Sequence, residues 1–307
     1  MERRFIASLE DEGERLDACL ARWMGISRRR AAAAIEADEV RVAGRRAPKG
    51  RLLQAGEEVV VRLALELSPV PEARPLVVRY EDETLLVVDK PSGIFTHPLV
   101  AGETGTLANA VVAHAPSCAS ASTDPREGGA AHRLDRETSG LVLFAKERPA
   151  WERLRRAFSE RTVHKEYLAL VRGEMRDWEI RSPIAPPVKG RARVARPSEE
   201  GREAVTLVRA LRAVARPGGG RWTLVRCTIP TGVMHQIRVH LDSVGHPIAG
   251  DPLYGNARFP GLDRLFLHAS ALAFSHPKSG ARLRIDSPLP PELRGLVEPL
   301  ASSSKSR

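Results

Sequence analysis

Cysteine is scarce in this chain, with three among 307 residues. Cys19, Cys118 and Cys227 lie far apart in the sequence. A disulfide-stabilised scaffold needs a denser set of cysteines, and a Cys-x-x-Cys metal site needs two of them close together. The cysteine content therefore predicts neither kind of structure, and it gives no reason to expect an oxidising compartment.

Long apolar runs are also missing. No stretch approaches the ~18 consecutive apolar residues that a membrane helix needs. The first residues, Met1 to Phe5, lack the hydrophobic core of a signal peptide. We therefore expect a cytoplasmic protein without a membrane partner.

The charge balance is strongly positive. The chain has 48 Lys and Arg against 38 Asp and Glu, which gives a net charge of +10 and a pI near 10.1. Such an excess favours an anionic partner, most simply nucleic acid, and the alternative is a generally arginine-rich proteome. With 42% hydrophobic residues, 307 residues are enough for two domains, one of them with a sizeable core.

Residues 1–66 are expected to form a small N-terminal domain. A first helix is predicted by apolar residues at helical spacing from Leu16 onward, and Gly25 ends it. Ser27 is a good N-cap for a second helix. Two short β-type runs follow, at 40–42 and 59–61, separated by turn residues.

Positive charge in this head gathers between residues 28 and 51, where eight Lys or Arg stand against three acids. Arg28, Arg29 and Arg30 open the second helix and are our candidates for contact with an RNA backbone. A solvated helix face is the alternative. The order of two helices and a hairpin also resembles the S-four-like RNA-binding domain, on the runs Ile26-Ser27-Arg28, 40–44 and 53–57.

The larger part of the chain, residues 77–300, is expected to be an α+β domain with a mainly antiparallel, mixed sheet, because strands dominate and βαβ repeats are few. Residues 67–76, with three prolines, are expected to be a linker, and residues 301–307 a disordered tail. Mobile or irregular loops are predicted at 115–129 and 186–201. β-type runs lie at 76–78, 85–88, 141–144, 167–171, 205–208 and 222–227, and helical segments at 106–113, 150–158 and 235–244.

One run carries more chemical information than any other: HRLDR at residues 132–136, followed by turn residues and a buried strand. Arg133 and Arg136 favour the ionised form of Asp135, which would then be ready to attack or to accept a proton. A charged loop fixed to the end of a buried strand is a common place for catalysis. On local chemistry alone, a surface aspartate in a salt-bridged turn is the alternative.

The run HRLDRETSGLVLFAK resembles the catalytic signature of RluA-type pseudouridine synthases. Further blocks resemble the same family in the family's order, and together they cover nearly all of the chain after the linker. They are YEDETLLVVDKPSG from Tyr80, HKEYLALV from His164, TGVMHQIRVHLDSVGHPIAGDPLYG from Thr231, and LHA and HPKSG from Leu267 and His276.

The resemblance implies an enzyme that breaks the bond between uracil and ribose, turns the base and rejoins it through a carbon, without a redox step, a metal or an organic cofactor. Asp135 would act at the sugar–base junction, either by adding to the sugar or by removing a proton from it. Arg238 would hold the charge of Asp135, and Tyr167 would lie against the target uracil. Arg133 would fill the space left by the flipped nucleotide.

Each of these side chains also has a plainer role. Arg238 could form an exposed pair with Asp242, Tyr167 could pack in the core, and Arg133 could contact a phosphate. A metal site built from the histidines is not expected, because His235 and His240 diverge on a helix. The further residues for which we expect RNA contact are His132, Arg136 and Lys165.

One position departs from the family pattern: Val233 stands where the family usually has Arg. Our hypothesis is an RNA pseudouridine synthase that acts as a monomer on a uridine in structured RNA. As the resemblance implies, the substrate would be large-subunit ribosomal RNA, with transfer RNA as the second choice. A non-catalytic RNA-binding ribosome-assembly factor is the alternative from another class.

Overall fold

The computed structural model describes residues 2–26, 28–48, 50–62, 67–188, 190–215 and 220–298. The predicted cap Ser27 and the predicted tail at 301–307 lie outside these residues. None of the described helices is long and apolar enough to cross a membrane. Contacts divide the chain into two compact units, Met1–Leu76 with Phe95–Ala130 and Phe144–Trp151, and Val77–Ile94 with Ala131–Leu143 and Glu152–Arg307.

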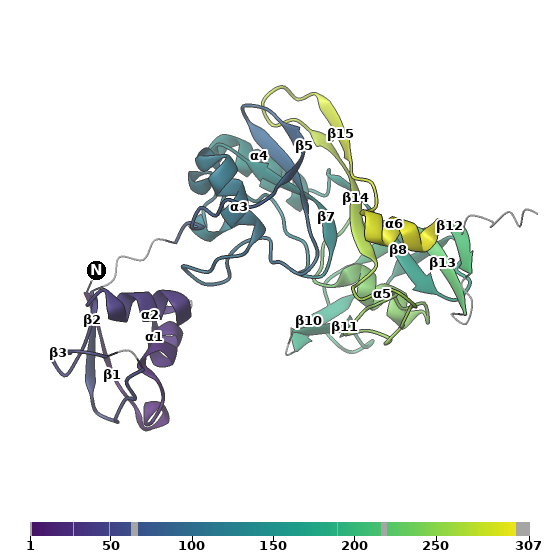
Figure 1. Cartoon of the computed structure of the whole chain (residues 1–307). Helices are drawn as coiled ribbons and strands as arrows, with labels where there is room; N and C mark the ends of the chain where they lie inside the picture. The colour runs from purple at the N-terminus through teal and green to yellow at the C-terminus, as the bar shows by residue number, and fades with distance from the viewer. Residues whose placement is uncertain are drawn as a thin grey trace, which may run out of the picture. The chain divides into compact units, whose positions relative to one another are not determined.

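The N-terminal head contains the two expected helices and the expected hairpin (Figure 1). Its sheet has the order β1-β4-β2-β3, and all of its pairings are antiparallel. The first helix ends at Gly25, whose φ of 62° is the left-handed conformation that favours glycine. The head's elements are β1 (Glu2–Ile6), η1 (Leu9–Asp11), α1 (Leu16–Met24), α2 (Arg28–Glu36), β2 (Val40–Val42), β3 (Arg45–Arg46) and β4 (Glu58–Arg62).

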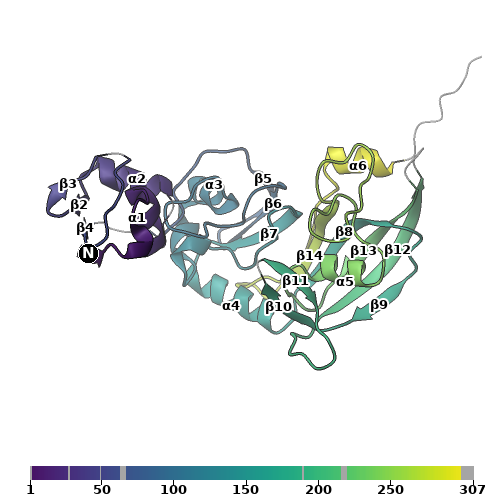
Figure 2. The same ribbon diagram turned by 90° about the horizontal axis from the view of Figure 1, so that it is seen from below.

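A nine-stranded sheet dominates the second unit (Figure 2). Its order is β5-β6-β7-β14-β8-β13-β12-β9, with β15 also paired to β14. Of the pairings described, only that of β7 with β14 is parallel, which confirms the predicted α+β class with a mainly antiparallel, mixed sheet. The strands are β5 (Val77–Glu81), β6 (Leu85–Lys90), β7 (Ser139–Ala145), β8 (His164–Arg172), β9 (Trp178–Arg181), β12 (Val205–Ala215), β13 (Arg221–Thr228), β14 (Leu267–Ser275) and β15 (Arg282–Asp286).

Two segments predicted as loops contain regular structure instead. The small-residue stretch after α3 forms two 3-10 helices and buries Cys118 and Ala121, because small side chains let a tight turn pack inward. The Pro- and Arg-rich stretch forms an antiparallel hairpin. Its strands were not predicted, because proline is uncommon within strands and its presence favoured a loop. The remaining elements are α3 (Leu107–His114), η2 (Pro116–Ser120), η3 (Pro125–Glu127), α4 (Arg148–Ser159), β10 (Ile184–Val188), β11 (Arg191–Val194), α5 (Gln236–Ser243) and α6 (Pro291–Val297).

The parallel contact between β7 and β14 positions the candidate site. Gly140 lies opposite Ala269 there, and Tyr167 of β8 lies opposite the same alanine on its other side. Gly140 has a φ of 114°, and a Cβ atom at this position would lie 2.3 Å from the carbonyl oxygen of Ala269. Only glycine therefore allows the two strands to approach so closely. This register places the start of β7, which follows the HRLDR loop, one strand away from the strand that carries Tyr167.

Candidate active site

Asp135 lies in a turn just before β7. Its carbonyl accepts a hydrogen bond of 3.1 Å from the N–H of Thr138, which closes the turn. The Asp135 side chain is 27% exposed, so it lies at the boundary between the protein interior and solvent. A substrate can therefore reach the carboxylate from solvent, whereas the nearby side chains of Tyr167 and Arg238 are buried.

A buried lysine fixes the backbone of this turn. Lys90 donates hydrogen bonds of 2.9 Å to the carbonyl oxygens of Pro91, Ile94 and Arg136, which use all three of its N–H donors. Burial lowers the pKa of Lys90 to about 7, and the charges of Asp135 and Glu137 oppose that change. Lys90 thus ties the loop after β6 to the residue that follows Asp135.

Arg238 is held close to Asp135 but is bound mainly by another acid. Its Nε and Nη2 atoms donate to the two carboxylate oxygens of Asp251, each at 2.7 Å. Its Nη1 lies 3.7 Å from Oδ2 of Asp135. The guanidinium also stacks over the ring of Tyr254, 5.0 Å from its centre. Arg238 is buried, so the exposed pair with Asp242 is wrong.

Tyr167 and His235 complete the surroundings of Asp135. Tyr167 is buried in β8, and burial together with the Asp135 charge raises the pKa of its hydroxyl, which keeps its proton. Nε2 of His235 lies 3.9 Å from Oδ2 of Asp135. The helix α5 was expected to begin at His235, but this residue has a left-handed φ of 57° and the helix begins one position later.

Buried polar bonds fix α5 against the sheet. The amide of Gln236 donates to the carbonyl of Val205 at 2.8 Å and accepts from Thr231 at 2.9 Å. The two ring nitrogens of His240 lie 2.9 Å from Thr206 and from the carbonyl of Ser182, which occupies both in protein contacts. Arg238 therefore projects from a helix that is bonded to β12 by buried polar groups.

The residues predicted to contact RNA near the catalytic loop are placed differently from one another. Arg133 and Arg136 are exposed, and Arg136 also donates to the carbonyl of Gly93 at 2.8 Å. His132 accepts a bond of 3.1 Å from the N–H of Leu143. Lys165 is buried and donates to the carbonyl of Thr231 at 3.0 Å. RNA contact by these four side chains stays a prediction.

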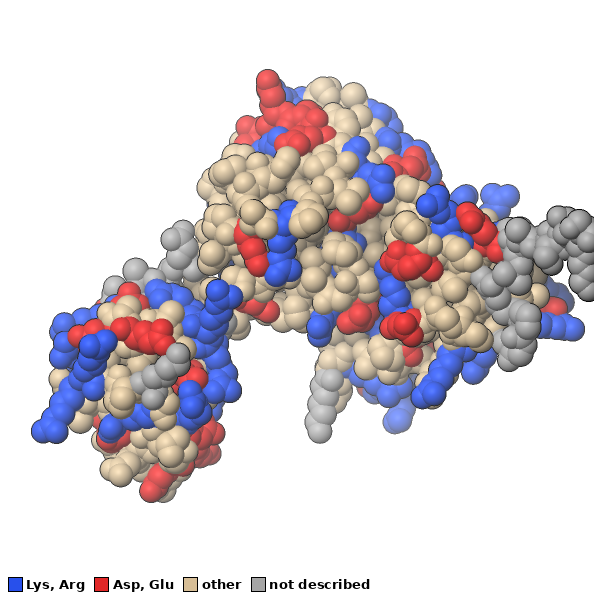
Figure 3. All heavy atoms as spheres, viewed as in Figure 1, with Lys and Arg blue, Asp and Glu red and all other residues tan. Residues whose placement is uncertain are grey.

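In the head, the arginines that open α2 form bonds within the protein. Arg28 lies 3.2 Å from Asp17, and Arg30 lies 3.4 Å from Glu39. Arg29 donates to the hydroxyl of Thr104 at 3.2 Å. Figure 3 shows Lys and Arg of the head interleaved with Asp and Glu rather than in one uninterrupted field.

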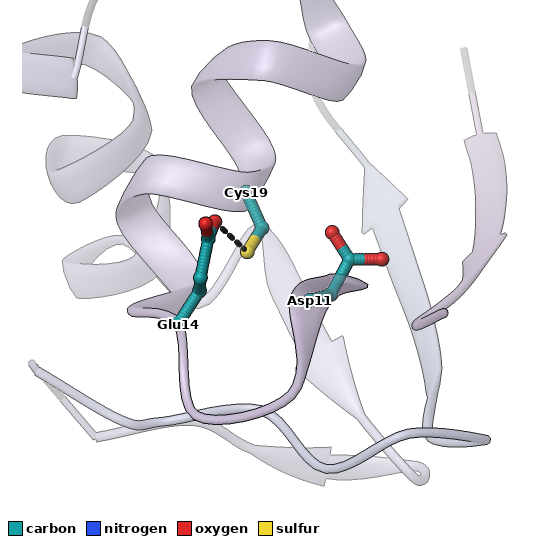
Figure 4. A group of neighbouring side chains, drawn as sticks. All are labelled: Asp11, Glu14 and Cys19. Carbon is teal, nitrogen blue, oxygen red and sulfur yellow. Dashed lines mark hydrogen bonds between the residues drawn. The ribbon is translucent and has the colours of Figure 1, made fainter. Parts of the chain in front are cut away.

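A cluster of Asp11, Glu14 and Cys19 in the head has ligand-type atoms close together (Figure 4). Arg22 donates to Asp11 and, at 2.9 Å, to Glu14, so one guanidinium is the shared cationic partner of both carboxylates. The Cys19 thiol donates to Glu14 at 3.4 Å, and burial raises its pKa to about 11. The cluster is therefore a hydrogen-bonded ion network that joins α1 to the segment before it.

Lys90, Asp251 and Tyr254 had no role in our sequence interpretation, and His235 was considered there only as a metal ligand and set aside. All four lie inside the blocks that carried the family resemblance, but their partners are distant in sequence. The structure also accounts for valine at position 233, where the family usually has arginine: Val233 packs against a small apolar core that includes Tyr254. An arginine there would face that core.

Comparisons with known proteins show the family of this chain. A family model described as RNA pseudouridylate synthase matches residues 84–243. Ribosomal large subunit pseudouridine synthase D of Neisseria meningitidis serogroup B is 38% identical over 309 residues, covering 95% of this chain and 80% of that protein. Ribosomal large subunit pseudouridine synthase C of Escherichia coli K12 is 35% identical, covering 98% of this chain and 97% of that protein.

A solved structure agrees as well. The human RNA pseudouridylate synthase domain containing 1 matches with a TM-score of 0.57 and 25% identity, covering 71% of this chain and 86% of that one. With the matched family model and relatives that align over nearly its full length, the chain belongs to the RNA pseudouridylate synthase family, and it is of the RluA type that its sequence blocks resemble.

Proposed function

We propose that this enzyme converts uridines of large-subunit ribosomal RNA to pseudouridine, with Asp135 as the catalytic carboxylate. In the isomerisation the bond between N1 of uracil and C1′ of ribose breaks, and C5 forms the new bond to C1′. C5 loses its proton and N1 gains one, so the atoms balance without a second substrate. The carboxylate would either add to C1′ or remove a proton from the sugar.

The observation that carries the proposal is the arrangement around Asp135. The carboxylate is partly exposed, and Nη1 of the buried Arg238 lies 3.7 Å from it. The negative charge of Asp135 also acts on the hydroxyl of Tyr167, which keeps its proton. The buried guanidinium supplies a fixed counter-charge beside a reachable carboxylate. The aromatic ring offers a surface on which a flipped base can stack, and its hydroxyl is available for proton transfer.

Ribosomal RNA is the preferred substrate because the relatives aligned over nearly the whole chain are named for the ribosomal large subunit. The S-four-like resemblance of the head supports the same class of substrate, with Arg28, Arg29 and Arg30 as phosphate contacts and Arg133, Arg136, Lys165 and His132 as contacts near the target. We propose that the enzyme works as a monomer in the cytoplasm, where it meets that RNA.

The experiment measures tritium release from RNA labelled at C5 of uracil, because isomerisation liberates that label. Wild type should release tritium from unmodified large-subunit ribosomal RNA, and Asp135→Asn should release none above background. Asp286→Asn, which removes an exposed carboxylate of β15, is the matched control and should react like wild type.

Two outcomes would contradict the proposal. Release from labelled transfer RNA with none from ribosomal RNA would assign the enzyme to transfer RNA. Equal background release by wild type and Asp135→Asn from both RNAs, with the two proteins equally folded, would favour a non-catalytic RNA-binding factor.

A further inference from the structure

Tyr254 is buried in the loop after Asp251, and its hydroxyl joins two separate elements. The hydroxyl oxygen accepts a hydrogen bond of 3.0 Å from the N–H of Ala192 in β11. The same oxygen lies 2.9 Å from Nδ1 of His235. Within the described part of the chain, these two contacts account for its hydrogen bonding.

The direction of the second bond follows from counting protons. A phenol has one O–H proton, and the bond from Ala192 uses only an oxygen lone pair. Burial raises the pKa of Tyr254, so the proton stays on the oxygen, and among the described residues its acceptor is Nδ1 of His235. The reverse bond would leave a buried O–H without an acceptor, which is costly. Nδ1 of His235 therefore carries no proton.

A neutral imidazole has one N–H proton, so a ring with none on Nδ1 carries that proton on Nε2. That atom lies 3.9 Å from Oδ2 of Asp135, so the N–H lies on the side of the proposed catalytic carboxylate. Burial lowers the pKa of His235, and the nearby charges of Arg238 and Arg133 act in the same direction, against those of Asp135 and Asp251. The ring is thus neutral near pH 7.

We infer that Tyr254 is a positioning residue for the reaction: its hydroxyl holds His235 as the neutral Nε2–H tautomer, so that a neutral N–H, and not a lone pair or a second cation, lies beside the carboxylate of Asp135. The inference rests on the proposed function. A neutral N–H beside the anion does not pair it with a second full positive charge, which leaves the carboxylate free to attack or to accept a proton.

The ring of Tyr254 has a separate role that a suitable variant can preserve. It lies under the guanidinium of Arg238 at 5.0 Å and packs in the small apolar core with Val239. Tyr254→Phe removes the hydroxyl and keeps these contacts. Tyr80→Phe is the matched control, because it removes the hydroxyl of a tyrosine in β5 that donates to the carboxylate of Asp82.

The first test is spectroscopic and needs no substrate. Long-range proton–nitrogen NMR of the full chain with nitrogen-15 histidine, assigned through loss of one signal set in His235→Asn, reports which ring nitrogen carries the proton. We expect Nε2–H in wild type at pH 7, with Nδ1 shifted as a hydrogen-bond acceptor. That shift should disappear in Tyr254→Phe and remain in Tyr80→Phe.

The second test is kinetic, on tritiated ribosomal RNA. Tyr254→Phe should lower kcat about three- to tenfold, the effect of one net hydrogen bond, and leave KM unchanged. In a His235→Asn background, which tolerates the left-handed backbone at this position, the same substitution should cause no further loss. Tyr80→Phe should behave as wild type.

The inference is overturned by a proton on Nδ1 of wild-type His235, by a kcat of Tyr254→Phe equal to wild type, or by an equal loss in the His235→Asn background. A wild type without activity on any RNA would refute the proposed function instead, and the NMR result would still decide the tautomer.

Discussion

Asp251 binds Arg238 more closely than Asp135 does. Two bonds of 2.7 Å join the guanidinium to Asp251, whereas its distance to Asp135 is 3.7 Å. Asp251 also accepts the backbone N–H groups of Leu253 and Tyr254, at 2.8 and 3.1 Å. The arginine is therefore positioned by a satisfied, buried partner, and it faces Asp135 with its remaining nitrogen. Such a fixed cation needs little rearrangement when charge develops at the reacting centre.

Replacement of Asp251 by Asn should affect both folding and catalysis. The amide oxygen can still accept the backbone bonds, but the buried charge of Arg238 loses its partner. Breaking a buried ion pair costs about 3–5 kcal/mol in the free energy of unfolding. Displacement of the guanidinium should lower kcat on labelled RNA by about 10–100-fold. Urea unfolding and tritium release measure the two effects.

Asp286→Asn is the control for Asp251, because it breaks an exposed pair with Arg284 at 2.9 Å. Its unfolding free energy should stay within about 0.5 kcal/mol of wild type. A stable and fully active Asp251→Asn protein would show that Arg238 holds its place without this carboxylate.

Lys90→Met should loosen the catalytic turn. Methionine fills similar space but leaves the carbonyl groups of Pro91, Ile94 and Arg136 without their donor. Because the removed lysine was itself costly to bury, we expect a net loss of about 1–3 kcal/mol in unfolding free energy. Hydrogen exchange of the amides at 135–138 should become faster.

Lys278→Met gives the comparison for Lys90, since its ammonium is exposed and 3.9 Å from Glu83. It should change neither the unfolding free energy nor the exchange of the turn. If Lys90→Met leaves that exchange at the wild-type rate, the three carbonyl bonds do not rigidify the turn.

Local sequence signals were enough for much of the secondary structure. The apolar spacing and Gly25 located α1, and the β-type runs located the centres of β6, β7, β8 and β13. The order of the strands in the sheet and the parallel contact of β7 with β14 were not predictable from the sequence, because strand pairing depends on contacts between distant segments.

The site shows the same division. Asp135, Arg238 and Tyr167 were chosen from the motifs, and the structure brings them into one region. The ion pair of Arg238 with Asp251 and the bond of Tyr254 to His235 join residues 13 and 19 positions apart through a loop. Periodicity within a helix gives no information on such loop contacts, so the helical spacing offered only Asp242, four residues on, as an alternative partner of Arg238.

The role of the head can be tested through salt dependence. Charge reversal of Arg28, Arg29 and Arg30 to Glu should flatten the dependence of RNA affinity on salt concentration, by about 0.9 in the log–log slope for each phosphate that the head no longer neutralises on a duplex target. Filter binding at several salt concentrations measures it. Reversal of Arg282 and Arg284 in β15, which changes the net charge by about four units where the head variant changes it by about six, is the control on another surface. An unchanged slope in the head variant would assign recognition to the rest of the chain.

Acidification should destabilise the protein through His132. Burial lowers the pKa of this ring to about 3, and the charges of Lys165 and Arg155 add to the effect. Nε2 accepts a backbone bond from Leu143, so the folded state excludes the proton. Between pH 6.5 and about 3 the unfolded chain binds a proton that the folded chain does not, so stability rises with pH in this window and is fully present above it.

His132→Gln keeps a hydrogen-bond acceptor for Leu143 and cannot titrate. Its unfolding free energy should fall less steeply than that of wild type below pH 6.5, by up to about 1.4 kcal/mol per pH unit. Phe158→Leu trims the ring that packs on His132, 4.6 Å between centres, and so exposes the imidazole to water. It should bring the pKa of His132 closer to its ordinary value and make the loss of stability on acidification shallower than in wild type. If His132→Gln and wild type lose stability in parallel on acidification, the ring is accessible to protons in the folded state and is free to contact RNA as a cation.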